Sequence, residues 1–102
     1  MCVKDADLGD LNVWNVISYP NPAKDVVDFI FYLNKPASVS ITVYTLTGRV
    51  VAKIESEGVP SANSVTWHCG DTGLANGIYI YKLSAQAGTE LMFRVNKMMI
   101  MQ

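Results

Sequence analysis

Residues 78–85 read IYIYKLSA, and this stretch decides the fold class of the chain. Tyr79, Tyr81 and Leu83 recur at every second position, and two isoleucines fill positions between them. A period of two is that of a β-strand, whose successive side chains point to opposite faces of a sheet. Because both faces of this stretch are apolar, the sequence predicts a strand in the interior of a sheet.

Strand-like segments continue on both sides of this stretch, each ended by turn residues. Pro20-Asn21-Pro22 closes the first segment, and Thr47-Gly48 forms a short hairpin loop. A polar stretch at residues 55–63 contains Gly58 and Pro60 and is expected to separate two strands. Short strands at this spacing predict an all-β fold, an immunoglobulin-like antiparallel β-sandwich of about seven strands. The expected strands are residues 13–19, 26–33, 39–44, 50–54, 64–68, 78–85 and 90–101.

Alternation within these strands predicts which side chains form the core. In the second strand Phe29 and Phe31 share a face with two aliphatic neighbours, and in the last strand Leu91, Phe93 and Val95 supply an apolar face. The run at residues 98–101 exceeds simple alternation, so one of its faces is expected to stay exposed, and residues 98–102 are expected to be dispensable for folding. The alternative is that both faces of the run are buried in the sandwich.

Length and charge exclude several function classes. The chain has 102 residues, half of them hydrophobic, which suits one domain with a real core. We assign residues 12–102 to the sandwich and residues 1–11 to a linker or an expression remnant. Eight Lys and Arg residues and a net charge of −1 make nucleic acid an unsuitable partner. No signal peptide is visible at the start, and no apolar stretch reaches the length of a membrane helix.

Residues with catalytic or metal-binding chemistry are sparse, and we expect no enzyme activity, metal site, cofactor or small-molecule substrate. His68 and Cys69 are neighbours on a strand end, so their side chains point apart and cannot form a nucleophilic pair. Cys2 and Cys69 are either two unpaired small apolar residues or a disulfide between the N-terminal segment and a loop. The acidic run at residues 5–10 lacks the ligands of a calcium loop.

Three ordered segments resemble a known family. They are Tyr19-Pro20-Asn21-Pro22-Ala23, the stretch ITVYTLTGRVV at residues 41–51, and GLANGIYIYKL at residues 73–83, followed by a last strand with Lys97. Their order and spacing resemble the C-terminal sorting domain of type IX secretion cargo in Bacteroidetes-type bacteria. The resemblance covers residues 17–101.

This resemblance implies a sorting signal that carries a larger protein through the outer membrane. The implied partners are the outer-membrane secretion machinery, a sortase and the N-terminal domains of the parent protein. The implied location is the periplasm in transit, then the cell surface or the medium. Candidate recognition residues are Gly48, Arg49, Lys97, Met98, Met99, Ile100, Met101 and Gln102. The structural motif residues are Pro20, Asn21, Pro22, Gly77, Tyr79 and Leu83.

Two alternatives from other function classes remain open. The same segments also resemble the flagellar hook-capping immunoglobulin-like domain, which implies a structural or assembly module at the end of a secreted or cell-surface protein. Exposed aromatic rings can also form a platform for carbohydrate, although most of them alternate with core positions here. The aromatic candidates are Trp14, Tyr19, Tyr32, Tyr44 and Trp67.

Overall fold

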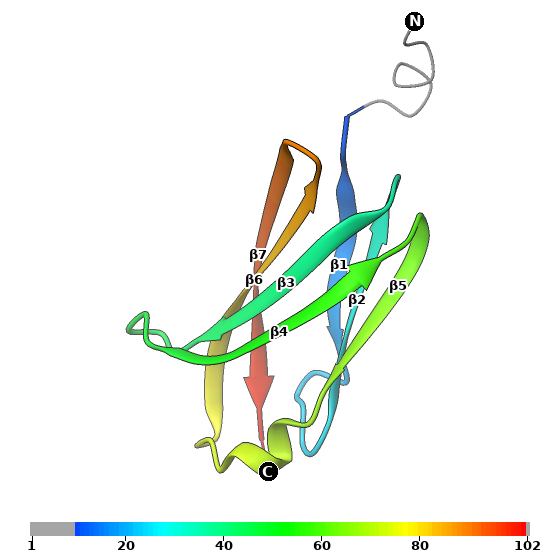
Figure 1. The fold of residues 1–102 in the computed structure, drawn as a ribbon. Helices are drawn as coiled ribbons and strands as arrows, with labels where there is room; N and C mark the ends of the chain where they lie inside the picture. The colour runs from blue at the N-terminus through cyan, green and yellow to red at the C-terminus, as the bar shows by residue number, and fades with distance from the viewer. Residues whose placement is uncertain (1–9, 102) are drawn as a thin grey trace, which may run out of the picture.

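The structure, a computed structural model, describes residues 10–101, and these form two antiparallel sheets packed face to face (Figure 1). The three-stranded sheet has the order β1-β2-β5, and the four-stranded sheet has the order β4-β3-β6-β7. This confirms the all-β sandwich, and it confirms that β6 lies inside its sheet. The strands are β1 (Val13–Tyr19), β2 (Val27–Leu33), β3 (Ala37–Tyr44), β4 (Val50–Gly58), β5 (Ser61–Trp67), β6 (Gly77–Ala87) and β7 (Glu90–Ile100).

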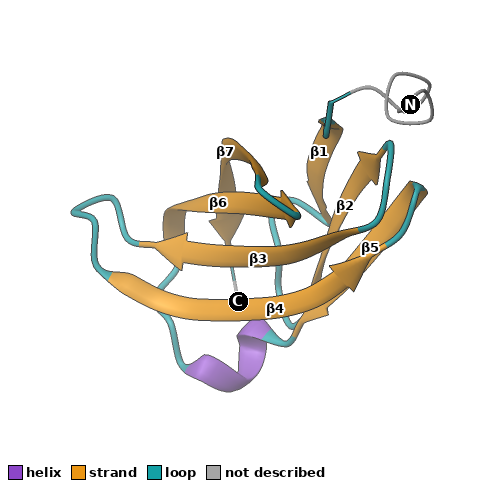
Figure 2. Cartoon of the chain, turned by 45° about the horizontal axis from the view of Figure 1, so that its top comes forward, coloured by secondary structure: helices purple, strands orange, loops and turns teal. Residues whose placement is uncertain are grey.

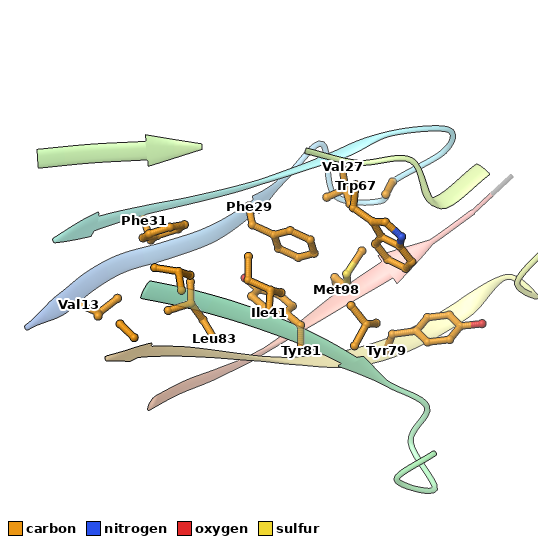
Figure 3. Packing of buried hydrophobic residues seen from close by; sticks show 14 of the residues in the cluster. Val13, Val27, Phe29, Phe31, Ile41, Trp67, Tyr79, Tyr81, Leu83 and Met98 are labelled. Atoms are coloured by element: carbon orange, nitrogen blue, oxygen red, sulfur yellow. The ribbon is translucent and has the colours of Figure 1, made fainter. Parts of the chain in front are cut away.

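The core lies between the two sheets and is made by alternate residues of the inner strands (Figure 3). Phe29 of β2 packs against Tyr81 of β6 with ring centroids 4.8 Å apart, and against Trp67 of β5 at 6.4 Å. Each of these rings comes from a different strand, so the aromatic contacts join both sheets. The face assignments for β2 and β6 are confirmed, because their buried residues alternate as predicted.

The inward face of β7 differs from the expectation. Leu91, Phe93 and Val95 are 51%, 47% and 64% exposed, so the prediction that they face the core is wrong. The core side of β7 instead carries Met98 and Ile100, which are 2% and 0% exposed. One face of the C-terminal run is thus part of the packed interior, and the other face, with Met99 and Met101, reaches the surface as expected. The buried face argues against the prediction that the run is dispensable for folding.

The expected polar loop at residues 55–63 is also wrong. β4 continues to Gly58 and β5 begins at Ser61, so only two residues carry the chain from one sheet to the other. Gly58 is buried, and a Cβ built on it would collide with the Leu33 side chain. Polar side chains here belong to the exposed faces of two edge strands, which explains why the stretch looked like a loop.

The remaining connection between β5 and β6 is a short 3-10 helix, Cys69–Thr72. Among residues 10–101 there is no helix that is long and apolar enough to cross a membrane. Cys69 is fully buried, while His68 before it is exposed.

The sandwich is elongated, with principal extents of 52 × 23 × 17 Å. The N-terminal and C-terminal ends of the described chain lie at opposite ends of this long axis (Figure 1). The backbone N–H of Leu11 donates to Glu90 at the start of β7, whereas Met101 follows the other end of that strand. Figure 2 shows how strongly the four-stranded sheet curves, with β4 along its margin.

Candidate recognition site

The C-terminal end of β7 is bound to the Pro20-Asn21-Pro22 turn, although 78 residues separate the two in sequence. Ala23 donates its N–H to the carbonyl of Met99 at 2.7 Å, and Met101 donates to the carbonyl of Ala23 at 2.8 Å. These two bonds form a parallel bridge between Ala23 and Ile100. The proline-rich turn therefore adds one short paired segment to the outer edge of β7.

Asn21 strengthens this junction with its side chain. Its Oδ1 accepts the N–H of Met99 at 3.0 Å. The peptide bonds preceding Pro20 and Pro22 are both cis. The motif resemblance marked these residues as a turn, but no local signal shows that the turn contacts the last strand.

A shallow depression of about 290 Å³ lies over this junction. Its walls come from the turn, the start of β6 and the end of β7. Ile78 is 43% exposed there, and Met99 lies directly opposite it across the β6–β7 pair. The lining residues are Asn21, Pro22, Ile78, Lys97, Met98 and Met99.

The candidate recognition residues of the C-terminal run divide into two sets. Lys97, Met99 and Met101 reach the surface, whereas Met98 and Ile100 are in the core. Gln102 lies outside the described residues. Of the C-terminal run, one lysine and two methionines are therefore accessible to a partner.

Gly48 and Arg49 occupy a separate surface, the β3–β4 hairpin, which projects away from the C-terminal end (Figure 1). Gly48 has φ of +94°, a conformation that favours glycine. The Thr45 hydroxyl accepts the N–H of Arg49 at 3.1 Å, and the Arg49 residue is exposed as expected for a hairpin position.

The motif residues of β6 have structural positions. Leu83 is fully buried, and Tyr79 is 6% exposed with its hydroxyl donating to the carbonyl of Ala75 at 2.7 Å. Gly77 begins β6 and pairs with Ile100 of β7. The GIYIYKL signature thus describes the central strand and its entry turn.

The groups considered for chemistry do not assemble. Burial raises the pKa of the Cys69 thiol above its ordinary value, which disfavours the thiolate that a nucleophile needs. Within residues 10–101, no three His, Cys, Asp or Glu side chains gather as metal ligands would. Cys2 and most of the acidic run at residues 5–10 lie outside the described residues.

The aromatic candidates are also divided between core and surface. Trp67 is 8% exposed and packs in the core. Trp14 and Tyr32 stack on each other on the outer face of the three-stranded sheet, with centroids 5.9 Å apart.

A family model supports the resemblance seen in the sequence. The model for the "Secretion system C-terminal sorting domain" matches residues 18–100. No curated protein matches the sequence.

Two solved structures from Porphyromonas gingivalis share the fold. Dimeric latent PorU is 19% identical with a TM-score of 0.74, and the match covers 90% of this chain and 9% of that chain. PorZ, described as an essential bacterial surface component of the type-IX secretion system, is 21% identical with a TM-score of 0.55. That match covers 86% of this chain and 12% of PorZ. This chain therefore spans about a tenth of either protein, and at these identities the likeness establishes the fold alone.

Proposed function

Because this chain belongs to the family of secretion system C-terminal sorting domains, we propose that it directs a larger protein through the outer membrane by type IX secretion. The match of the family model over residues 18–100 is the observation that carries this proposal. The parent protein would pass the periplasm and reach the cell surface or the medium. The secretion machinery and a sortase would recognise the folded domain.

The proposed mechanism is recognition, with no chemistry by the domain itself. The junction between the Pro20-Asn21-Pro22 turn and β7 offers a partner a depression lined mainly by apolar residues, with one cation, Lys97. Apolar side chains that remain exposed on a folded domain are suited to a protein partner. Methionine side chains such as Met99 adapt to irregular surfaces because they are unbranched and polarizable.

An export assay tests this proposal. Residues 10–102 are fused behind a reporter that carries its own periplasmic signal, in a cell competent for type IX secretion. The reporter should reach the surface or medium with the domain and stay in the periplasm without it. Equal retention with and without the domain would contradict the proposed sorting role.

A matched pair of variants locates the recognition surface. Lys97→Ala with Met99→Ala removes outward side chains beside the depression, and this variant should lose export while remaining folded. Lys53→Ala on β4 removes another exposed lysine from a different strand and should be exported normally. Export of both variants at the wild-type level would contradict the assigned surface.

A further inference from the structure

The two sheets have four edge strands. Backbone groups on the outer edge of β7 are already hydrogen-bonded to another segment of the chain. Ala23 and Asn21 hydrogen-bond its C-terminal end. Farther along, the Asn96 side-chain amide donates to the Val16 carbonyl of β1 at 3.1 Å, which ties β7 to the facing sheet. A further strand cannot add along β7 without displacing these contacts.

Edge β1 is irregular, and edge β5 lacks charged side chains. The pairing of β1 breaks between Trp14 and Ile17, where Asn15 has φ of 54°. At the start of β5, the Asn63 side chain binds both the N–H and the carbonyl of Val59, at 2.9 and 2.8 Å. Ser61 there has φ of 86°. The register of β5 with β2 is unbroken from Ser61 to Trp67, but β5 carries no charged side chain that could select a partner by charge.

β4 combines a regular edge with charged side chains. Its register with β3 is unbroken from Gly58 to Ala52. A strand edge of this length presents alternate N–H and carbonyl groups to solvent, which is the template for adding a strand from another chain. β4 lies along the margin of the sheet, where Figure 2 shows it in front of β3.

The two faces of β4 define what kind of strand it would accept. On the outer face Lys53, Glu55 and Glu57 are exposed at every second position. On the core side Ile54 and Ser56 are half-buried, and Ile54 packs against the core. An added strand would complement this edge with small apolar residues toward the core and basic residues opposite the two carboxylates.

A groove beside these carboxylates has room for long side chains. It has a volume of about 500 Å³ on the outer face of the four-stranded sheet, and its walls are polar apart from Val39 and Leu91. The Ser38 hydroxyl lies 3.4 Å from Glu57 within it. Lysine or arginine side chains that reach this groove would find carboxylate, hydroxyl and amide acceptors. The lining residues are Ser38, Val39, Ser40, Glu55, Ser56, Glu57, Ser84, Gln86 and Leu91.

We propose that β4 binds, by antiparallel strand addition, an extended segment of a partner protein with the order basic–apolar–basic–apolar–acidic. The basic residues lie opposite Glu57 and Glu55, and the acidic residue lies opposite Lys53. A second copy of this chain fits less well. The antiparallel register that sets Lys53 opposite Glu55 of the other copy leaves Glu57 opposite Val51. The proposal is separate from the sorting role, since strand addition requires no export.

The test uses a blocked synthetic peptide, Thr-Lys-Val-Lys-Val-Glu-Thr, and the isotopically labelled full chain. Added peptide should shift the NMR signals of β4 and slow amide exchange there. The charge-reversed peptide Thr-Glu-Val-Glu-Val-Lys-Thr should bind about fivefold more weakly, on the scale of a few exposed ion pairs. Glu55→Gln with Glu57→Gln should weaken binding similarly, whereas the exposed Asp71→Asn control should not.

Two further peptides separate strand addition from binding by charge alone. One peptide is N-methylated on the first valine, and the other on the lysine that follows it. Because successive amides of a strand point to opposite sides, only one of these two methylated amides would face β4. One peptide should bind as before and the other should fail. Equal binding of both, no binding of any peptide, or shifts confined to another edge would overturn the proposal. So would a protein dimer through β4 that the peptide disperses, because this would assign the edge to a second copy.

Discussion

The side-chain oxygen of Asn21 connects the Pro20-Asn21-Pro22 turn to the last strand, β7. Its bond to the Met99 N–H satisfies a backbone donor on the outer edge of β7. Asn21→Ala should lower the free energy of unfolding by about 1 kcal/mol, the usual net value of one hydrogen bond. Urea denaturation measures this difference. Asn21→Asp keeps an acceptor oxygen and should lose less, so an equal loss in both variants would contradict the role of this bond.

Two phenylalanines from different sheets, one in the core and one on the surface, provide a direct test of the packing. Phe31 is fully buried, so Phe31→Ala should cost about 3–5 kcal/mol, and Tyr79→Ala should cost a similar amount. Phe93 is 47% exposed and contacts the Lys82 ammonium at 4.9 Å from its ring centroid. Phe93→Ala should cost only about 1 kcal/mol or less. If Phe93→Ala proved as costly as Phe31→Ala in denaturant titrations, the phase of β7 would be wrong.

Stability should fall at alkaline pH because of a buried phenol and a buried thiol. Burial raises the pKa of Tyr81 and the pKa of Cys69 above their ordinary values near 10 and 9. The folded state holds these protons more tightly than the unfolded state, so their contribution is complete below pH 9. It is lost as the pH rises through the folded pKa values.

Variants separate the two groups. Tyr81→Phe and Cys69→Ala should each flatten the decline in unfolding free energy above pH 9, measured by urea titration at successive pH values. Tyr19→Phe, which removes a phenol from a residue 64% exposed, is the control and should leave the slope unchanged. An unaltered slope in both buried variants would contradict the assignment.

At the scale of elements, sequence alternation identified all seven strands, but it did not predict which face of the last strand is buried. Leu91, Phe93 and Val95 alternate as the residues of a core face do, but the pairing of β7 with β6 places them on the outer face. Leu83 faces the core and lies opposite Arg94, so Arg94 shares its side of the sheet.

The polar residues on the inner side of β7 have a physical reason to be there. The first half of the strand faces the edge of β1, where Arg94 donates to the Asn12 side chain at 3.3 Å and Asn96 binds the Val16 carbonyl. Only the second half reaches the packed interior. Periodicity within one strand cannot show where the facing sheet ends, and neither can it show that the Pro20-Asn21-Pro22 turn lies against β7.

The C-terminal end of β7 should be needed for folding. Deleting residues 98–102 removes Met98 and Ile100 from the core together with the partners of Ala23, so the truncated chain should lose its cooperative thermal transition. Circular dichroism measures this loss.

Point variants keep this test informative if the truncation simply aggregates. Met98→Ser exposes the core and should destabilise by about 2–5 kcal/mol, the range for large core deletions. Met99→Ser on the outer face should cost much less. Equal costs for the two would contradict the inward and outward assignment.

At the scale of the whole molecule, the two ends of the described chain are set far apart. Leu11 is 3% exposed, and Glu90 accepts its N–H while forming an ion pair with Lys35. A domain attached before residue 10 therefore leaves from the end of the sandwich opposite the depression. The elongated shape keeps such cargo clear of the surface that we assign to recognition.

This geometry predicts that the side of attachment matters. A reporter fused before residue 10 should be exported, whereas the same reporter fused after Gln102 should not, because it would crowd the junction of Met99 and the Pro20-Asn21-Pro22 turn. Both fusions should show the same thermal transition of the domain, which separates obstruction from unfolding. A long Gly/Ser spacer before the C-terminal reporter should restore part of the export by moving the reporter away. Export that does not depend on the side of attachment would place recognition on another surface, such as the β3–β4 hairpin with Arg49.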